Sequence, residues 1–204
     1  MRDTKLITMI EGAIIAGVCV ALSFIPLNTA NASFDLSLGL IPLGVYALRR
    51  GALPAMAVGF VWGVLLIVVG KAYFLTIPQV LLEYPVAFAF GGFGGILAPL
   101  LHRQLASVAS DGESASSPGH AAPSIGPAIR TIIFAGVIAA VARWFFHFWA
   151  GFIFWGSYAP EGVSPFAFSL FFNGISAAAN AGMLAVVLLV IFRAARPLFI
   201  PKEL

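Results

Sequence analysis

Long apolar runs, separated by short polar or charged breaks, dominate the chain. The runs lie at residues 6–25, 34–48, 52–70, 77–101, 129–150 and 164–192. A helix that crosses the roughly 30 Å hydrocarbon core of a bilayer needs about 20 mostly apolar residues. Most of the runs approach or exceed this length, and 34–48 is a marginal span. The pattern predicts an all-α integral membrane protein, with six transmembrane helices bundled into a single membrane domain over residues 1–204.

Residues 107–127 interrupt the apolar pattern between the fourth and fifth runs. This stretch is rich in Ser, Ala, Pro and Gly, and it contains Asp111 and Glu113. Such a composition is typical of flexible connections. We therefore expect a flexible polar linker at this point.

The composition excludes a soluble globular class. The chain is 61% hydrophobic and 9% charged, whereas soluble domains have about 25% charged residues. Its surroundings are therefore membrane lipid, and a net charge of +3 does not indicate a nucleic-acid partner. The single cysteine, Cys19, excludes an internal disulfide framework and a Cys-based zinc site. We expect neither a metal nor a cofactor.

The basic residues predict the orientation, because cytoplasmic loops are enriched in Lys and Arg. With the N-terminus inside, only Lys71 falls in an outer loop and Arg143 falls within a span. Both termini are therefore expected to be cytoplasmic. The basic residues placed on the cytoplasmic side are Arg2, Lys5, Arg49, Arg50, Arg103, Arg130, Arg193, Arg196 and Lys202.

Four polar side chains fall in the outer half of the predicted spans. They are Glu83 in the fourth run, Arg143 and His147 in the fifth, and Asn173 in the sixth. Ionisable groups inside a membrane are costly and usually face a cavity or a partner. Together with the many aromatic residues nearby, they predict a ligand pocket with apolar walls and a few placed polar groups. Glu11, near the inner end of the first run, does not join them.

The spacing in the fifth run sharpens this prediction. Arg143, His147 and Gly151 recur every four residues, which places them on one helix face, and Trp155 continues the series. We expect Arg143 to orient Glu83 or the loop backbone. Three other interpretations stay open: an ion pair between Arg143 and Glu83 that only locks helices together, an interfacial aromatic belt, and an intramembrane enzyme that uses Glu83 and His147 as an acid–base pair.

Motifs of other function classes are absent from the sequence. There is no Walker A, HExxH or GxSxG sequence, so the chain carries no recognisable ATPase, metalloprotease or serine-hydrolase signature. The glycine-rich stretch at 91–95 lies inside a span, where close helix packing or a kink is the expected role. Ala13 and Gly17 form a small-residue face on the first span, which indicates either internal packing or docking of another membrane protein.

Several motifs resemble the thiamin-specific S component of energy-coupling-factor transporters, and the similarity extends over almost all six spans in order. The motifs are Gly70-Lys71-Ala72-Tyr73, Leu82-Glu83-Tyr84, Arg143 to Phe148, Gly151, Phe154-Trp155, Tyr158-Ala159 and Ser169 to Gly174. The 107–127 stretch is longer than is usual in that family.

The resemblance implies a prokaryotic plasma-membrane subunit that is not an enzyme. Such a subunit captures thiamin from outside, and works with a transmembrane coupling subunit and two cytoplasmic ATPase subunits. An S component for another vitamin remains the alternative within this class. Ala13 and Gly17 match the family's docking face.

The resemblance also implies binding residues. Those that match the family are Glu83, Tyr84, His147, Gly151, Trp155 and Asn173, with Tyr73 in a lid-like outer loop. Three further positions differ in residue type: Phe34 stands near a family tryptophan, Phe168 replaces a tyrosine, and Arg143 stands where some members have lysine.

The chemistry of these residues suits thiamin. Its thiazolium ring is a permanent cation, which aromatic faces attract and the Glu83 carboxylate can balance. The Asn173 amide offers donors and an acceptor to an aminopyrimidine edge, and the Trp155 indole can stack on a flat ring.

Overall fold

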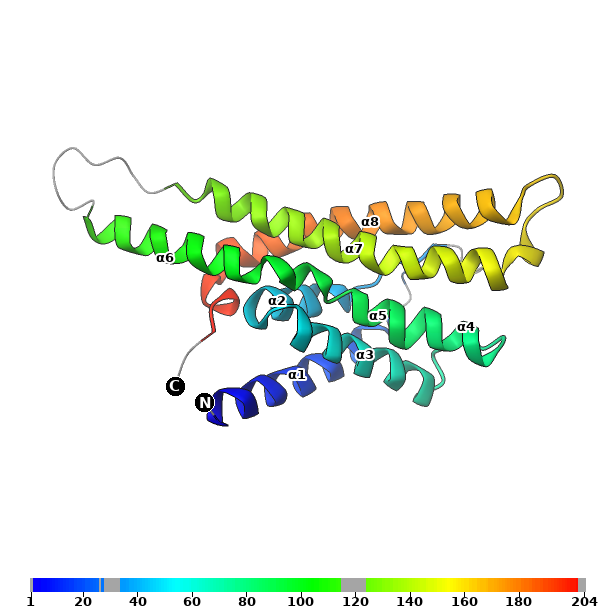
Figure 1. Ribbon diagram of the computed structural model, residues 1–204, viewed down its shortest axis with the longest axis horizontal. Helices are drawn as coiled ribbons and strands as arrows, with labels where there is room; N and C mark the ends of the chain where they lie inside the picture. The colour runs from blue at the N-terminus through cyan, green and yellow to red at the C-terminus, as the bar shows by residue number, and fades with distance from the viewer. Residues whose placement is uncertain (1, 26, 28–33, 115–123, 202–204) are drawn as a thin grey trace.

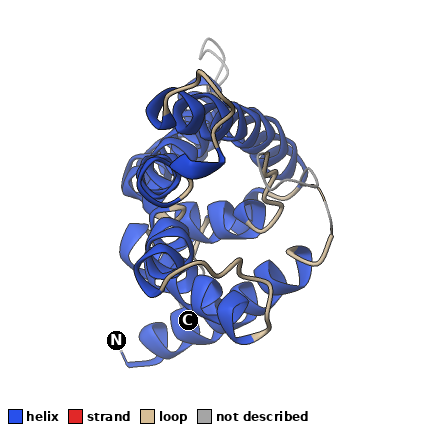
Figure 2. Cartoon of the chain, turned by 90° about the vertical axis from the view of Figure 1, so that its right-hand side faces the viewer, coloured by secondary structure: helices blue, strands red, loops and turns tan. Residues whose placement is uncertain are grey.

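The computed structural model describes residues 2–25, 27, 34–114 and 124–201, and these residues form helices and loops without any strand (Figures 1 and 2). The elements follow in the order α1 (Arg2–Leu22), α2 (Leu40–Arg50), α3 (Ala52–Val68), α4 (Ile77–Leu81), the π-helical turn η1 (Leu82–Val86), α5 (Ala87–Phe90), the 3₁₀ turn η2 (Phe93–Leu97), α6 (Ala98–Ser114), α7 (Gly126–Phe154), the 3₁₀ turn η3 (Gly156–Tyr158), α8 (Pro165–Ala194) and the 3₁₀ turn η4 (Arg196–Phe199). The predicted all-helical class is confirmed.

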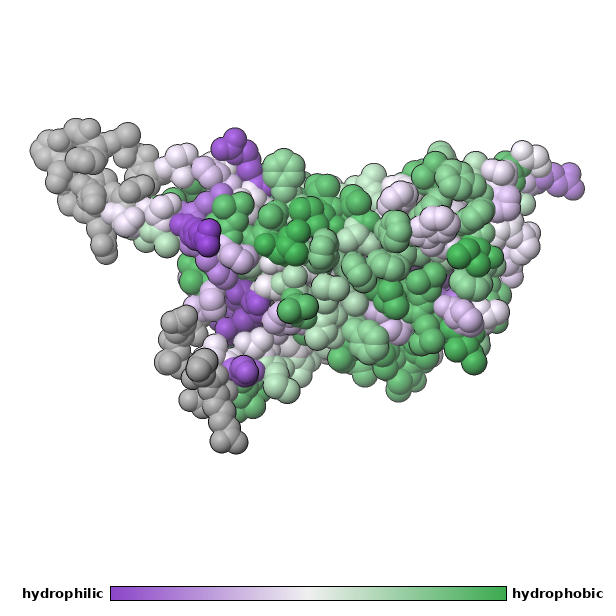
Figure 3. Space-filling model, viewed as in Figure 1, coloured by the Kyte–Doolittle hydropathy of each residue, from purple (hydrophilic) through white to green (hydrophobic). Residues whose placement is uncertain are grey.

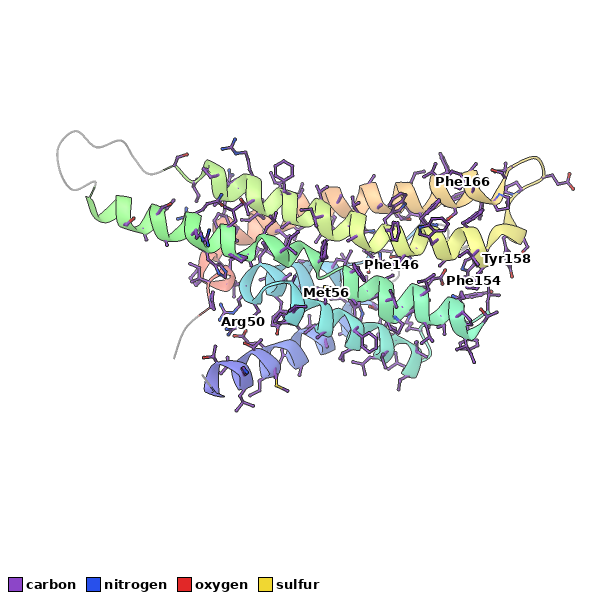
Figure 4. The ribbon with its side chains drawn as sticks, in the orientation of Figure 1. Arg50, Met56, Phe146, Phe154, Tyr158 and Phe166 are labelled. Atoms are coloured by element: carbon purple, nitrogen blue, oxygen red, sulfur yellow. The ribbon has the colours of Figure 1, made fainter. Side chains whose placement is uncertain are left out.

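The helices run along the long axis of the molecule, with Arg50 toward one end and Tyr158 toward the opposite end (Figures 1 and 4). Four helical stretches are long and apolar enough to cross a membrane: Thr4–Leu22, Ile77–Ser110, Gly126–Phe154 and Pro165–Ala194. The first of these is α1, the second joins α4 to α6, and the last two are α7 and α8. The shorter α3 is also apolar. Hydrophilic residues gather at the Arg50 end, whereas the middle of the molecule presents a largely hydrophobic surface (Figure 3).

The second predicted span is only partly helical. Residues 34–39 are irregular, and α2 occupies Leu40–Arg50. Irregular backbone at membrane depth is tolerated where protein side chains satisfy it. Here Asn180 on α8 accepts from the Ser37 N–H at 2.9 Å and donates to the Asp35 carbonyl at 2.7 Å. The predicted helix over 34–39 is therefore wrong, because α8 supplies the hydrogen bonds that a helix would have made.

The predicted linker is also shorter than expected at both ends. α6 continues to Ser114 and α7 already begins at Gly126, so the outer parts of 107–127 are helical. Residues 115–123 lie outside the described residues.

Small residues allow the helices to approach closely at several points. A Cβ atom added to Gly59 or Gly63 on α3 would come within 2.2 Å of the Phe88 carbonyl or 2.5 Å of the Tyr84 backbone. A Cβ atom added to Gly92 would likewise lie 2.5 Å from the Ala55 backbone. The glycine-rich stretch thus serves close packing, as expected, and the two α3 glycines set the position of the chain around Tyr84.

A charged cluster closes the Arg50 end. Glu11 on α1 pairs with Arg49 at 3.1 Å and with Arg50 at 2.6 Å. Arg49 also donates to the carbonyls of Pro197 and Ile200, which fixes η4 against α2. The middle of α1, the end of α2 and η4 therefore meet toward one end of the molecule. As predicted, Glu11 does not join the other polar residues of the predicted spans.

Candidate functional site

A cavity of about 1170 Å³ opens among η1, α5, α7, α8 and the loop residues around 22–25, 35–38 and 71–73. Pockets for small organic ligands measure about 300–1,000 Å³, so the cavity can enclose such a molecule. Nine of the predicted site residues line it: Tyr73, Glu83, Tyr84, Arg143, His147, Gly151, Trp155, Phe168 and Asn173. Phe34 is half-buried beside the lining residue Asp35 and is not itself part of the lining, so its place in the site stays a prediction.

The Glu83 carboxylate is held by two side chains. The Trp155 indole N–H donates to Glu83 Oε1 at 2.6 Å, and the Gln79 amide donates to Oε2. Glu83 makes no ion pair with any residue in the part of the chain that the structure describes. A carboxylate has about four acceptor sites, so both oxygens can accept further hydrogen bonds from a ligand.

The local fold at Glu83 follows from Pro85. Proline has no N–H and cannot make the hydrogen bond to the residue four positions earlier, and the chain forms the π-helical turn Leu82–Val86 around it. π-helical turns of this kind are frequent at functional sites. Gly63 allows α3 to support this turn from behind. Glu83 and Tyr84 are thereby placed at the cavity by a break in the helix.

Tyr73 and Tyr84 connect this turn to the loop at residues 71–76. The Tyr84 hydroxyl accepts from the Tyr73 backbone N–H at 2.7 Å. The Tyr73 ring lies 5.1 Å from that of Trp155. The loop therefore packs over the residue that holds Glu83.

The predicted face of α7 does line the cavity, but its members lie at different levels. Arg143 and Trp155 are separated by twelve residues, which is about 18 Å along a helix. Arg143 pairs with Asp35 at 3.0 Å and lies 4.6 Å from the Phe88 ring centre. The expectation that Arg143 orients Glu83 or the loop backbone is therefore wrong: Glu83 meets Trp155 at the other end of the face, and the hydrogen-bond partner of Arg143 is the Asp35 carboxylate.

His147 lies between these two levels. Its ring meets the Phe88 ring at 6.1 Å in an edge-to-face arrangement. Its Nε2 atom is buried and has no hydrogen-bond partner in the described part of the chain. This nitrogen is available to a ligand that reaches the middle of the cavity.

Gly151 and Asn173 lie where α7 and α8 approach each other closely. The Asn173 amide nitrogen donates to the Ser169 carbonyl and hydroxyl, both at 3.1 Å. A Cβ atom on Gly151 would lie 2.4 Å from Ser169 Oγ and 2.7 Å from Asn173 Nδ2. Gly151 is therefore needed so that Asn173 can stand beside α7.

Two of the polar residues here were not predicted from the sequence. Asp35 was not assigned to the site, although an acidic residue at the outer end of a predicted span is a signal in so apolar a chain. Gln79 is fully buried and lies four residues before Glu83 on the same helix face, a spacing that could have indicated it.

The small-residue face of α1 lies away from the cavity. Ala13 and Gly17 are exposed, and a Cβ atom on Gly17 would meet nothing within 4 Å. The neighbouring Gly12 and Ala16 face the protein instead. Ala13 and Gly17 therefore do not pack inside the protein, and docking of a partner on them stays a prediction.

Comparison with known proteins assigns the chain to a family. The family model described as "Thiamine transporter protein" matches residues 9–200. The chain is 36% identical to the thiamine transporter ThiT of Lacticaseibacillus paracasei over 206 residues, which cover 99% of this chain and 94% of that protein. It is 25% identical to the thiamine transporter ThiT of Bacillus subtilis over 196 residues, which cover 95% of this chain and 94% of that protein.

A solved structure agrees with these matches. ThiT from Listeria monocytogenes superposes with a TM-score of 0.85 at 35% identity, and the alignment covers 97% of this chain and 99% of that one. With its long apolar helices, the chain is thus a multi-pass cell-membrane protein, and it belongs to the thiamine transporter family.

Proposed function

We propose that this chain is the substrate-binding subunit of a vitamin uptake transporter and captures thiamin in the cavity around Glu83. The observation that carries the proposal is a carboxylate without an ion-pair partner in the described chain, placed beside aromatic rings. Thiamin is a permanent cation with two flat rings that a methylene group joins. Aromatic faces attract such cations more strongly where water is excluded, and the Glu83 charge offsets the ligand's own.

The remaining polar groups suit the neutral parts of the ligand. Asn173 uses its amide nitrogen on Ser169, which leaves its oxygen to accept from an aminopyrimidine amino group. The His147 Nε2 atom is buried, has no hydrogen-bond partner in the described chain and can bond to a ligand. Arg143 does not repel the cation strongly because Asp35 neutralises it. Lys71, the other basic residue of the lining, lies over the Phe24 ring at 4.8 Å. Glu83 is thus the acidic side chain of the lining that has no ion-pair partner in the described chain, and it can pair with the ligand's positive charge.

Transport requires partners that this chain does not supply. We infer a transmembrane coupling subunit and two cytoplasmic ATPase subunits of an energy-coupling-factor module, with Ala13 and Gly17 on the outward face of α1 as the docking contact. The excess of Lys and Arg at one end of the helices supports a cytoplasmic location for both termini, with the cavity opening toward the outside.

Two alternative functions, an enzyme and an S component for another vitamin, predict different experimental results. The enzyme interpretation has no support in the comparisons, because the matched family is a transporter family. An S component for another vitamin would bind that vitamin in preference to thiamin. An anionic vitamin would have to meet Glu83 with like charge.

Titration of the purified protein with a panel of vitamins tests the proposal. Thiamin is expected to quench tryptophan fluorescence, because Trp155 and Trp144 both line the cavity, and to compete out every weaker ligand. Pyrithiamine, which has a pyridinium in place of the thiazolium, is expected to compete as well. Saturable binding of another vitamin with no response to thiamin would overturn the proposal.

A further inference from the structure

Gln79 is a fully buried polar side chain that does not line the cavity. It lies on α4, one turn before Glu83. Its amide nitrogen donates to the Glu83 carboxylate and, at 3.1 Å, to the Tyr73 carbonyl. Its amide oxygen accepts from the Leu75 N–H at 2.9 Å. Both amide hydrogens are therefore used, and the orientation of the amide is fixed by its surroundings.

The 71–76 loop depends on this side chain. Its backbone is irregular, so its polar groups need partners from outside the loop. Gln79 satisfies the Tyr73 carbonyl and the Leu75 N–H, and the Tyr84 hydroxyl satisfies the Tyr73 N–H. The loop is thus attached to the same short segment that carries Glu83.

We propose that Gln79 is a positioning residue that couples the 71–76 loop to the Glu83 carboxylate. The inference rests on the proposed function, in which Glu83 meets the ligand. Gln79 does not touch the ligand itself; it joins the carboxylate that meets the ligand to the loop that carries Tyr73 over Trp155. Release of a ligand beneath Tyr73 requires the loop to move, and this movement breaks the hydrogen bonds to Gln79. Gln79 therefore slows ligand release.

The coupling also works in the opposite direction, since linkage between two sites is reciprocal. The bond from Gln79 to Glu83 has a charged acceptor, and such hydrogen bonds are roughly twice as strong as neutral ones. A change at Glu83 is therefore transmitted to the loop even without a ligand. A residue that only filled space on α4 would not transmit it.

The first test replaces Gln79 with Met, an unbranched apolar side chain of similar length. Gln79→Met leaves the Tyr73 carbonyl and the Leu75 N–H without partners. We expect hydrogen exchange of the Leu75 amide to become about tenfold faster in the ligand-free protein. In stopped-flow measurements, thiamin dissociation is expected to become about tenfold faster while association changes less than about twofold.

The matched control is Gln104→Met. Gln104 on α6 accepts a hydrogen bond from Thr131 and lies outside the cavity lining. This variant removes an equivalent amide elsewhere, so neither the Leu75 exchange rate nor thiamin release is expected to change. Equal effects of the two variants on release would overturn the proposal, because they would reflect general loosening.

A second measurement covers the case in which Gln79→Met does not fold. In Glu83→Gln, the bond from Gln79 becomes a neutral one, and Leu75 exchange is expected to become about threefold faster without ligand. Unchanged Leu75 exchange in this variant overturns the coupling, as does unchanged thiamin release in a folded Gln79→Met protein. If the wild-type protein does not bind thiamin, the proposed function fails, and the exchange data still decide whether Gln79 holds the loop.

Discussion

The Asp35 carboxylate accepts a hydrogen bond from the Arg143 guanidinium at 3.0 Å, and this ion pair joins the segment before α2 to the middle of α7. Arg143 is buried, whereas the Asp35 side chain is 45% exposed. The Asp35 backbone is in turn attached to Asn180 and Ser176 on α8. Three separate parts of the chain, the segment before α2, α7 and α8, are thus held together at the level of Arg143 in the cavity.

Asp35→Asn is expected to lower both stability and thiamin affinity. The change leaves the buried Arg143 guanidinium without its counter-charge, which is costly. The unneutralised positive charge of Arg143 would then repel a cationic ligand. We expect a loss of about 1–2 kcal/mol in unfolding free energy, because the exposed carboxylate is screened by solvent. Thermal unfolding in detergent and thiamin titration measure the two effects. Asp35→Asn with Arg143→Met should recover most of the stability; no recovery would show that the pair is not the cause.

The position of this pair also shows how far the sequence could lead. Helical periodicity places Arg143, His147, Gly151 and Trp155 on one face, and all of them line the cavity. Periodicity does not reveal which acidic residue meets Arg143, because Asp35 lies in an irregular segment whose hydrogen bonds come from α8. A long-range contact of this kind depends on the tertiary structure and has no local pattern.

The same limit applies to the fourth span. Its length and hydropathy predict a helix over 77–101, yet the structure divides this stretch into several short elements around Pro85 and the glycines. A proline inside a helix removes a backbone hydrogen bond and favours a break there. The direction in which the break turns Glu83 depends on Gly63 of α3, which approaches the Tyr84 backbone. The helix could therefore be predicted, and the placement of its carboxylate could not.

Glu83→Gln is expected to weaken thiamin binding by about 2 kcal/mol or more, as for removal of one member of a desolvated charge pair. The amide keeps the size of the side chain and removes its charge. Isothermal titration of the purified variant measures the effect. The control is Glu11→Gln, at the Arg50 end of the molecule, which should reduce thermal stability and leave affinity unchanged. An unaltered dissociation constant in folded Glu83→Gln would remove this residue from the site.

Trp155→Phe separates the two roles of the indole. The phenyl ring keeps an aromatic face but loses the N–H that donates to Glu83 at 2.6 Å. We expect affinity about three- to tenfold lower than wild type, from the loss of one hydrogen bond to a charged group, and a further loss in Trp155→Ala. Trp144→Phe should have a smaller effect on affinity, since it is the Trp155 indole N–H that donates to Glu83. Equal losses from the two Phe variants would contradict this assignment.

Gly151→Ala is expected to reduce affinity without unfolding the protein. The new methyl group would displace Ser169 and Asn173, whose atoms lie 2.4 and 2.7 Å from its position. A shift of this size moves the Asn173 amide away from the ligand, so we expect a loss of about tenfold or more in binding. Gly174→Ala is the matched control on α8, where the added methyl group meets nothing within 4 Å. Normal binding by Gly151→Ala would show that the site adapts to the displacement.

Gly17→Trp separates capture of thiamin from its transport. Gly17 faces outward on α1, so a large side chain there does not disturb the interior; it would instead keep a partner helix at a distance and remove the close packing between them. Thiamin binding to the isolated protein is expected to stay intact, while ATP-driven uptake and co-purification with the coupling subunit are lost.

Two further variants serve as controls for this prediction. Ala16→Trp, at a site that is 2% exposed, should misfold and lose binding as well. Leu53→Trp, on an 81% exposed position of α3, controls for bulk on another outward face and should leave uptake unchanged. Normal uptake by Gly17→Trp would exclude this face as the docking contact, and equal losses from Gly17→Trp and Leu53→Trp would show that bulk alone, wherever it is placed, prevents assembly.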